Sequence, residues 1–568
     1  MNKIYSTIPL AQCIVELCAS KGIFDIVISP GSRNAPLTIG FTNHLKINCF
    51  SIVDERSAAF FALGMAQQSK KPVAVVCTSG SALLNYYPAV AEAFYSDIPL
   101  VVISADRPEH LIDVGDGQTI RQPNVFQNHI LYSANLKSDP VPYEKMISFF
   151  NKVEINKALN LSMEQRGPVH INAPFDEPLY NKSDELSVAC KNIPHRNKVK
   201  MVSEMDLKTF LQNWNNSSRR MILVGVNSPE KIDLKHLEFF ADDPSSLVFT
   251  ETTSNLHHAA FFSSIDTIIA PIEKDKKADY YFKKLQPEFL LTFGGMVVSK
   301  KIKAFLRKYP PRYHYHIDSK KAYNTFFALT KHLVTEPNLF LKEAIAEMTP
   351  IKSNYRKFWE EVKIHRKQRR AKYLKEIPYS DFMVFDEIFK KIPSHRMLQI
   401  GNSSAIRYAQ LFDLKNTISV FCNRGTSGID GSVSTAIGAA LASKKPTVLL
   451  TGDLSFFYDS NALWNNYIPE NFKIIIVNNG GGGIFRILPG DKKADYFEKF
   501  FETAHDLTAV QLAEMFHFEY KKIVSEAELS PKLKAFFSKE TKQVLEIFTP
   551  REINAEVLLN YFDYIGKD

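Results

Sequence analysis

The sequence predicts an α/β protein of three domains whose sheets are mainly parallel. Short apolar runs that end in turn residues and lead into segments of helical spacing recur along the chain, which is typical of βαβ units. A four-residue string also recurs together with its flanking strands, which indicates that two domains share one fold. The length of 568 residues is sufficient for about three or four domains. We expect domains over residues 1–180, 200–345 and 376–568.

Composition and charge exclude several classes of protein. The net charge of +9 is modest for this length, and the basic run over residues 363–375 has no aromatic interleaving, so we interpret it as a solvated helix or linker and expect no nucleic-acid partner. The six cysteines are scattered, as expected for reduced thiols in a cytoplasmic protein. Glu16 interrupts the apolar stretch near the first residue, which favours an amphipathic helix over a signal peptide, and no run is long enough for membrane insertion.

The first expected strand begins at Phe24 and ends at a Pro-Gly turn, after which come Ser32 and Arg33. Pro36 then lies in the first turn of a helix, where its missing N–H costs nothing. Arg33 is thereby placed at the carboxyl end of a parallel strand, the edge where ligands bind in such sheets. A surface charge is the alternative interpretation of Arg33.

The second expected strand, residues 47–53, leads into an acidic pair and then a helix over residues 58–68. Asp54 suits the N-cap of that helix, and Glu55 would complement its dipole. Alternatively, Glu55 is a partly buried acid with a raised pKa that transfers protons. The local sequence leaves both interpretations open.

An internal repeat relates the two outer domains. Ser-Lys-Lys-Pro at residues 69–72 recurs at residues 443–446, an offset of 374 residues. With that offset, Gly64 aligns with Gly438, and the expected strands 73–76 and 100–103 align with 447–450 and 474–477. A chance match of four residues would not also align the strands, so we interpret the two segments as copies of one domain.

The two copies differ at polar positions. In the ungapped alignment the pairs are Asp453 with Ser79, Asn479 with Ala105, and Ile429 with Glu55. The first copy therefore lacks the two oxygen ligands, and the second lacks the acid. This difference suggests that one fold is used once for a metal and once to present a carboxylate.

The segment from Thr447 to Phe485 predicts a metal and diphosphate site. Two strands joined by a short crossover helix, roughly residues 460–467, place Asp453 and Asn479 at neighbouring strand ends. Carboxylate and amide oxygens beside glycine carbonyls suit Mg²⁺ held together with a diphosphate. Each motif alone could be only a turn. A dinucleotide fingerprint does not fit, because Phe485 stands where its third glycine would be.

The middle domain shows the same alternation, with expected strands over residues 221–226, 289–293 and 313–317. Its glycines do not form a dinucleotide fingerprint, so a structural domain that also lends side chains is favoured over one that binds FAD or NAD. Lys300, Lys301 and Lys303 follow a glycine pair and could face a carboxylated substrate, although exposed surface lysines are the default interpretation.

The third domain has two further expected strands, residues 397–400 and 418–421. Asn402 and Ser403 follow the first strand, with Arg407 one turn into the next helix. Arg424 follows the second strand, so all of these lie at the ligand edge.

These motifs together resemble the thiamine diphosphate enzymes. More narrowly, the chain is similar to the family of 2-succinyl-5-enolpyruvyl-6-hydroxy-3-cyclohexene-1-carboxylate synthases of menaquinone biosynthesis in ISPGSRNAPL, DERSAAFFALGMA, TSGSALLNYYPAVAEA, ISADRP, GQTIRQ, NRGTSGIDG and GDLSFFYD. One departure from the broader family is Leu454, which follows Gly-Asp where a second glycine is usual. The outer domains would then be related thiamine diphosphate-binding folds, the first for the pyrimidine and the third for the diphosphate.

The resemblance implies roles for residues of both outer domains. Glu55 would hydrogen-bond the aminopyrimidine, and Ile429 would bend the cofactor; with them we expect Gln118 and Arg33 in catalysis. Asp453, Asn479 and the carbonyl of Gly481 would hold Mg²⁺ or Mn²⁺. The implied cofactor-binding set is Glu55, Asn402, Ser403, Ile429, Gly452, Asp453, Leu454, Ser455, Asn479, Gly481 and Ile484. The substrate-binding set is Ser32, Arg33, Gln118, Lys301, Ser403, Arg407, Arg424 and Phe485.

The implied reaction is decarboxylation of 2-oxoglutarate and addition of the resulting succinyl-semialdehyde carbanion to isochorismate. Both substrates carry carboxylates, which suits recognition by arginine. The alternative is another 2-oxo acid decarboxylase or an acetolactate-type synthase. The resemblance also implies a homodimer or homotetramer with active sites between subunits.

Overall fold

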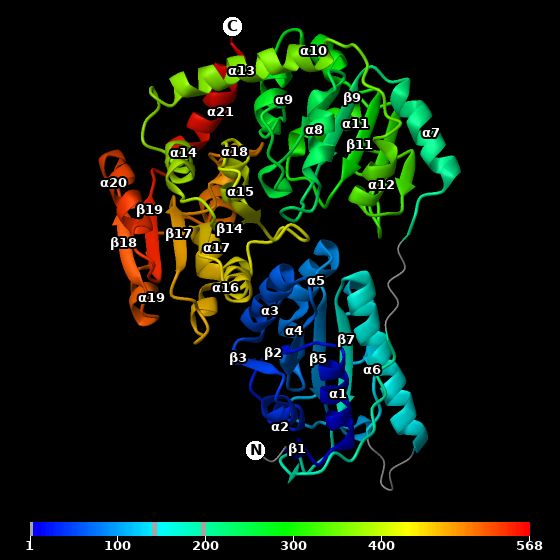
Figure 1. The fold of residues 1–568 in the computed structure, drawn as a ribbon. Helices are drawn as coiled ribbons and strands as arrows, with labels where there is room; N and C mark the ends of the chain where they lie inside the picture. The colour runs from blue at the N-terminus through cyan, green and yellow to red at the C-terminus, as the bar shows by residue number, and fades with distance from the viewer. Residues whose placement is uncertain (1–3, 139–144, 195–199, 568) are drawn as a thin grey trace.

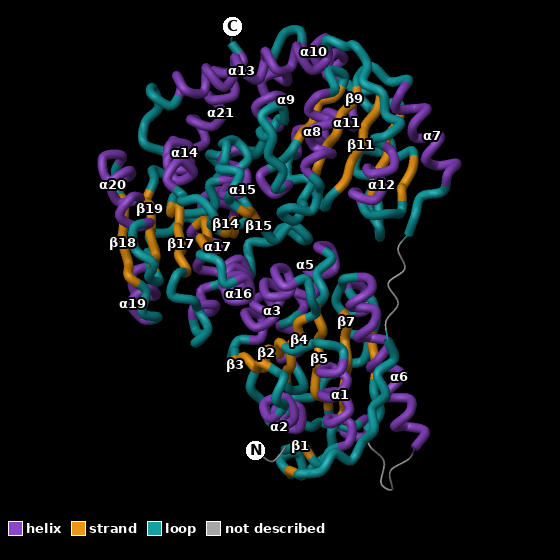
Figure 2. Tube along the Cα trace, in the orientation of Figure 1, coloured by secondary structure: helices purple, strands orange, loops and turns teal. Residues whose placement is uncertain are grey.

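The computed structural model describes residues 4–138, 145–194 and 200–567. The chain forms three α/β units, each made of one large sheet and the helices that cover it, which we call the first, middle and third layers (Figure 1). The first lies at one end of the molecule, and the other two lie side by side at the opposite end. Helices cover the sheets on their faces (Figure 2). Because each of the three large sheets is parallel and is covered by helices, the predicted α/β class is confirmed.

The first sheet has six strands in the order β3-β2-β4-β5-β7-β6, and every neighbouring pair is parallel. Its strands are β2 (Asp25–Ile28), β3 (Asn48–Ser51), β4 (Val73–Cys77), β5 (Leu100–Asp106), β6 (Ser133–Asn135) and β7 (Val169–Pro174). A separate antiparallel pair joins β1 (Tyr5–Ser6) to β8 (Lys182–Ser183). The chain therefore still contacts the first layer beyond residue 180.

The third sheet repeats this topology strand for strand, in the order β15-β14-β16-β17-β19-β18, again wholly parallel. Its strands are β14 (Met397–Ile400), β15 (Ser419–Phe421), β16 (Thr447–Gly452), β17 (Phe472–Asn478), β18 (Glu519–Ile523) and β19 (Gln543–Phe548). Two copies of one sheet topology are what the internal repeat predicted.

The strand register corrects one detail of the repeat. Asp106 pairs with Pro174 in the first sheet, and Asn478 pairs with Phe548 in the third. Because the connection from β16 to β17 is two residues shorter than that from β4 to β5, the ungapped alignment slips there. The structural counterpart of Asn479 is therefore Arg107 and not Ala105. The first copy still places no oxygen ligand at this position.

The middle sheet has five parallel strands in the doubly wound order β10-β9-β11-β12-β13. They are β9 (Arg220–Val224), β10 (Ser246–Phe249), β11 (Phe289–Phe293), β12 (Tyr313–Ile317) and β13 (Lys331–Leu333). Separate hydrophobic clusters lie on its two faces. Just past β9, a side chain at Gly225 would collide with the carbonyl of Gly295, so the loops after β9 and β11 touch by their backbones.

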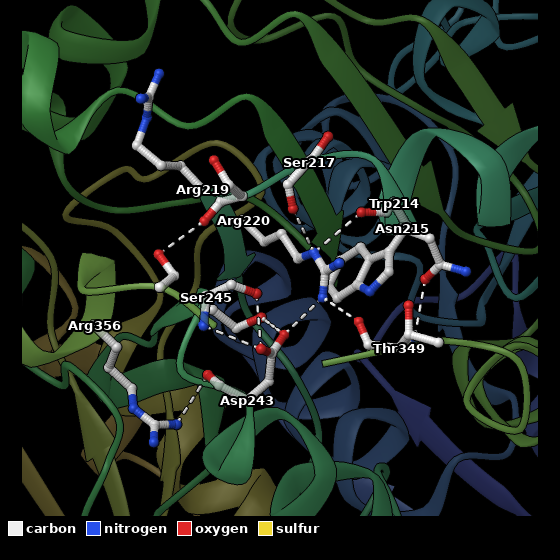
Figure 3. A network of polar contacts seen from close by, with 12 residues as sticks. Trp214, Asn215, Ser217, Arg219, Arg220, Asp243, Ser245, Thr349 and Arg356 are labelled. Atoms are coloured by element: carbon white, nitrogen blue, oxygen red, sulfur yellow. Dashed lines mark hydrogen bonds and ion pairs between the residues drawn. The ribbon is translucent and has the colours of Figure 1, made fainter. Parts of the chain in front are cut away.

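A buried ion pair anchors the start of this middle sheet (Figure 3). Arg220 and Asp243 are both fully buried and lie 2.9 Å apart. Arg220 also donates to the carbonyls of Trp214, Ser217 and Thr349. Its guanidinium stacks over the Trp214 ring, so the charge is compensated by surrounding acceptors, as a buried cation requires.

The helices follow the strands in the expected alternation. Those of the first layer are α1 (Pro9–Ser20), α2 (Ala35–Asn43), α3 (Glu55–Ser69), α4 (Ser81–Asn85), α5 (Tyr87–Ser96) and α6 (Lys145–Gln165). Those of the middle layer are α7 (Glu204–Asn215), α8 (Leu234–Asp242), α9 (Ile265–Glu273), α10 (Ala278–Leu285), α11 (Lys300–Lys308) and α12 (Pro337–Ala344). After the connecting α13 (Tyr355–Tyr373) come α14 (Asp381–Lys391), α15 (Ser404–Ala409), α16 (Ser432–Ser443), α17 (Asp453–Tyr458), α18 (Ile484–Ile487), α19 (Val510–Met515), α20 (Glu526–Phe537) and α21 (Ile553–Gly566).

The crossover between β16 and β17 differs from the expectation. Instead of a helix near residues 460–467, α17 begins at Asp453 itself and is followed by one 3-10 turn, Ser460–Leu463. A carboxylate in the first turn complements the helix dipole, so Asp453 favours an immediate helix start. In the structure, the carboxylate is thereby fixed at the edge of the sheet.

The basic run forms part of α13, so the predicted helix is present, but several of its cations are not solvated. Arg366 donates to carbonyls at Thr267 and Ile268, and Arg369 donates to the carbonyl of Tyr564. In Figure 1, α13 runs across the middle and third layers. These cations bind backbone acceptors of both layers, which the linear sequence could not indicate.

Among the described residues, no helix combines the length and the hydrophobicity that a membrane span requires.

Candidate active site

Asp453 and Asn479 meet at the carboxyl edge of the third sheet. Asp453 is 3% exposed and accepts a hydrogen bond from the backbone N–H of Gly481 at 2.9 Å. Asn479 is 8% exposed, and its Nδ2 donates to Asp381 at 2.9 Å. The Asn479 Oδ1 atom, also buried, has no hydrogen-bond partner among the described residues. A buried acceptor without a donor is costly unless something binds it.

Asp381 fixes which way the Asn479 amide faces. It begins α14, is 2% exposed, and also accepts from Thr549 Oγ1 at 2.6 Å. Because a carboxylate accepts only, the amide must present Nδ2 to Asp381 and direct Oδ1 elsewhere. Burial raises the pKa of Asp381 to about 6. Sequence analysis missed this residue, because nothing near it in the chain marks it as a partner of Asn479.

The oxygen set fits a divalent hard cation. One carboxylate, one free amide oxygen and a neighbouring peptide are typical of Mg²⁺ sites completed by a ligand's phosphates. Gly481 has φ +146°, a backbone conformation that side chains disfavour, and an added Cβ would lie 2.7 Å from the Glu502 carbonyl. The described residues contain no cluster of three or more His, Cys, Asp or Glu that could bind a metal, so a site here depends on amide and backbone oxygens.

His505 is a second residue at this site that sequence analysis missed. Its Nε2 lies 3.4 Å from Asp453 Oδ2, and its backbone N–H donates to the Gly480 carbonyl. Hydrogen bonding to Asp453 raises the pKa of His505. The segment Glu502–His505 therefore packs against the glycine run.

The other expected cofactor residues of the third layer gather around the same strand ends. Ser455 Oγ donates to the Ile429 carbonyl at 2.7 Å. Asn402 donates to the carbonyl of Gly428 and accepts from Arg424 Nη1, both at 2.7 Å. Their contacts thus connect β14, the loop after β15 and α17. Gly452 and Leu454 adjoin Asp453 in the chain, Ile484 is buried at the start of α18, and Phe485 packs edge-on against Phe501.

Ser403 has an unusual backbone. Its φ of +64° and ψ of −125° lie in a region that non-glycine residues rarely adopt. Its carbonyl accepts from Arg407 Nη1 at 2.7 Å. Strain of this kind persists where surrounding contacts enforce it and often marks a functional site. Here it turns the chain sharply between β14 and α15.

Glu55 lies at the corresponding edge of the first sheet. It is the first residue of α3, after Asp54, whose side chain caps the helix by accepting from the Ser57 N–H at 3.1 Å. Glu55 Oε2 accepts from Asn85 Nδ2 at 3.4 Å. Among the described residues, no hydrogen bond or ion pair connects Glu55 to Asp453 or Asn479. The described contacts of Glu55, in the first layer, are therefore separate from those of the oxygen site, in the third layer.

Two helices, α3 and α16, join the first layer, which carries Glu55, to the third layer, which carries Asp453. An added Cβ at Gly64 would lie 2.1 Å from the Thr435 carbonyl, and one at Gly438 would lie 2.0 Å from the Phe61 carbonyl. These positions are equivalent under the repeat, so α3 and α16 touch through matching glycines. One hydrophobic cluster includes buried residues of both helices.

Two polar contacts connect the start of α3 to the end of α17. Arg56 Nη2 donates to the Tyr458 carbonyl at 2.8 Å, and Asp54 Oδ2 accepts from Asn461 at 2.7 Å. Glu55 stands between these two residues in the sequence. The presentation of the acid is therefore coupled to the helix that Asp453 begins.

The expected anion-binding residues form two groups. In the first layer Arg33 is buried, donates to the Phe175 carbonyl at 3.0 Å and pairs with Glu177 at 3.4 Å. Burial, followed by the nearby Arg107, lowers the pKa of Arg33. Arg107 donates to the Gly117 carbonyl at 3.2 Å, so it also reaches the loop of Gln118. Sequence analysis did not single out Arg107.

Ser32 and Gln118 are exposed beside this first group. Gln118 has φ +57°, and its backbone packs against Gly80, where an added Cβ would lie 3.1 Å from the Gln118 carbonyl oxygen. A positive φ at a residue other than glycine is uncommon. The Gln118 side chain is thus presented by a constrained loop.

The second group lies between the middle and third layers. Burial, followed by Arg424, lowers the pKa of Arg407. Lys303 of α11 and Arg424 line one cavity of about 1340 Å³, and Arg424 is among the cations that lower the pKa of Lys303 after burial. Lys301, which the sequence favoured, instead forms an ion pair with Glu273. Among the described residues no hydrogen bond or ion pair connects this group to Arg33.

Comparison with known families and relatives identifies the class of protein. Residues 8–133 match the family described as "Thiamine pyrophosphate enzyme, N-terminal TPP binding domain", and residues 399–547 match "Thiamine pyrophosphate enzyme, C-terminal TPP binding domain". These two regions contain Glu55 and the Asp453–Asn479 pair, respectively.

Relatives named 2-succinyl-5-enolpyruvyl-6-hydroxy-3-cyclohexene-1-carboxylate synthase match nearly the whole chain. One from Christiangramia forsetii is 57% identical over 99% of both chains. Those from Flavobacterium johnsoniae and Porphyromonas gingivalis are 55% and 37% identical, over 98% and 100% of this chain and 99% of each relative. The chain therefore belongs to the family of 2-succinyl-5-enolpyruvyl-6-hydroxy-3-cyclohexene-1-carboxylate synthases among the thiamine pyrophosphate enzymes.

Proposed function

We propose that this chain catalyses decarboxylation of 2-oxoglutarate and transfer of the remaining four-carbon unit to isochorismate, in menaquinone biosynthesis. The observation that carries the proposal is the buried, partner-free Asn479 Oδ1 beside Asp453, in a chain 57% identical to a synthase of this name. Free hard oxygens at one site, in a chain that also carries two groups of cations, suit a metal diphosphate and substrates that carry carboxylates.

When bound, thiamine diphosphate supplies the carbon nucleophile and the electron sink for decarboxylation. Asp453, Asn479 and the Gly481 carbonyl are our proposed metal ligands. Asp381 holds the Asn479 Nδ2 group, which would leave the Asn479 Oδ1 atom free for the metal. Ser455 and Asn402 fix the loop that carries Ile429, which we propose as the apolar support of the cofactor.

Glu55 is the proposed proton-handling group. A carboxyl at the start of a helix, anchored on one side by the Asp54 cap, is held in a defined position. It would exchange a proton with a ring nitrogen of the pyrimidine, so its removal should affect rate more than cofactor retention.

The two cation groups are proposed to recognise the substrates. Arg33 and Arg107 lie together in the first layer, and Arg407 and Arg424 in the third. Planar guanidinium groups bind carboxylates through paired hydrogen bonds. Gln118, Ser32 and Ser403 are proposed as neighbouring contacts, with Ile484 and Phe485 as pocket walls.

We also propose a homodimer, or a tetramer built from it, in which Glu55 of one copy faces Asp453 of the other. Within the described part of one chain, no hydrogen bond or ion pair joins Glu55 to Asp453 or Asn479, which supports this arrangement. Exposed apolar side chains beside the helix pair also support it: Val53, Leu84, Tyr458 and Trp464 are 40%, 44%, 53% and 55% exposed. Light scattering of the purified protein should give at least twice the 64.6 kDa chain mass, and a monomer with full activity would contradict the arrangement.

The test of the reaction is an assay with isochorismate, 2-oxoglutarate, thiamine diphosphate and Mg²⁺. The succinyl adduct should form only with all four present, and Asp453→Ala should lose it. Turnover of pyruvate without isochorismate would instead favour an acetolactate-type synthase. We expect the protein in the cytoplasmic fraction of the cell, and recovery with membranes after a salt wash would contradict this placement.

A further inference from the structure

Glu251 is a buried carboxylate in the middle layer, at the amino end of α11. It follows β10, is 3% exposed, and accepts from the backbone N–H groups of Val298 and Ser299, both at 2.7 Å. Ser299 is the N-cap of α11, because its Oγ accepts from the Ile302 N–H. Glu251 therefore fixes the turn from which α11 begins.

This helix starts with an unfavourable charge arrangement. Lys300, Lys301 and Lys303 lie at its amino end, where the helix dipole is also positive. Carboxylates from other elements offset this charge: Lys301 pairs with Glu273, and Ser299 Oγ donates to Asp266. Glu251 is the carboxylate that accepts directly from the backbone at the helix start.

Glu251 also faces the second cation group. After burial and the two backbone hydrogen bonds, the charged groups that shift the pKa of Glu251 are Asp266 of α9, which raises it, and Arg424 of the third layer, which lowers it. Burial lowers the pKa of Lys303, the carboxylate of Glu251 raises it, and the nearby cations Arg424, Arg307 and Lys300 lower it. Lys303 and Arg424 line the interlayer cavity, so Glu251 lies behind two cations that face open space.

We propose that Glu251 is a positioning residue for substrate binding: it holds the turn that begins α11, the helix that carries Lys303 to the cavity that Arg424 also lines, and its charge contributes to the net charge around these two cations. The proposal rests on the function proposed above. It concerns a residue of the middle layer, which neither matched family region includes. Glu251 is not expected to touch the substrate.

The direction of the effect follows from electrostatics. Burial raises the pKa of Glu251 to about 7. An anion bound at Arg424 and Lys303 would disfavour the ionised form of Glu251 further, so binding and protonation of Glu251 support each other. The KM for the anionic substrate that occupies this cavity should therefore rise between pH 6 and pH 8.

The experiment measures KM and kcat of the cofactor-loaded enzyme from pH 6 to pH 8.5, for both substrates. Glu251→Gln should flatten the KM profile of one substrate and leave kcat within about threefold. Glu273→Gln is the matched control, because it removes a carboxylate from the same lysine row at an exposed ion pair, and it should keep the wild-type profile. An unchanged KM profile in a folded Glu251→Gln enzyme would refute the proposal.

A second measurement needs neither turnover nor a stable variant. Calorimetry of succinate binding to the wild-type holoprotein, in buffers of different ionisation enthalpy, counts the protons taken up. Uptake that peaks near pH 7 is expected, and binding without uptake would contradict the coupling, as would the absence of binding. If the synthase assay fails but succinate binding still takes up protons, the proposed reaction is rejected and the role of Glu251 is not.

Discussion

Asp381→Ala tests the inferred metal site through a residue that would not touch the metal. The substitution removes the acceptor 2.9 Å from Asn479 Nδ2 and frees the amide to turn. A hydrogen bond to a charged group contributes about 1.5–3 kcal/mol, and loss of such an outer partner commonly lowers metal affinity about 10–100-fold. We expect the Mg²⁺ concentration for half-maximal thiamine diphosphate binding to rise by that factor.

The assay is a Mg²⁺ titration of thiamine diphosphate binding, followed by protein fluorescence, so it does not depend on turnover. Asp381→Asn is the matched control, because its side-chain oxygen can still accept from Asn479 while its amide donates to Thr549, whose hydroxyl can reverse its role. This variant should stay within a few-fold of wild type. Equal Mg²⁺ dependence in wild type and a folded Asp381→Ala protein would refute the argument that Asp381 orients Asn479.

Three further predictions concern the acid, the helix pair and pH. Glu55→Gln should retain thiamine diphosphate in an equilibrium binding assay yet lose about 100-fold or more in turnover, since positioned acid–base groups contribute about 10²–10⁴-fold; near-normal turnover would remove its proton role. Gly438→Val should prevent the contact between α16 and α3, because even an added Cβ would lie 2.0 Å from the Phe61 carbonyl, and it should lower Tm by at least several degrees. Gly452→Ala is the control, because no atom lies within 4 Å of the added Cβ, and it should leave Tm unchanged. Burial raises the pKa of Asp459, which accepts from the Ser434 N–H, from 3.8 to about 7. A raised carboxyl pKa means that the folded state binds the proton more tightly, so stability should fall as pH rises from about 4 to 7, by up to about 4 kcal/mol from this group. Asp459→Asn should lack that part of the decline in urea unfolding at pH 5 and pH 8, and an identical decline would contradict the assignment.

The strands were the most predictable part of the fold. The expected ranges 289–293, 313–317 and 397–400 coincide with β11, β12 and β14. Residues 289–293, FLLTF, form a mostly apolar run that is buried at every position, the pattern of a strand covered on both faces, whereas 313–317, YHYHI, contains two histidines. Where the neighbouring helices begin was less predictable, as α17 shows by starting at Asp453. A Gly-Asp motif can form a turn after a strand or can begin a helix. The motif alone therefore does not locate the start of the helix.

The sequence by itself determined the sheet architecture, the repeat and the pairing of Asp453 with Asn479 at adjacent strand ends. These features follow from local patterns and from the rule that parallel strands end at one edge. Only the tertiary structure identified Asp381, His505 and Glu251 as residues that orient or balance a site. Asp381 is 98 residues from Asn479 in the chain, and Glu251 is 48 from Ser299. Such contacts arise when elements far apart in the chain pack together within one layer, and no local periodicity encodes them.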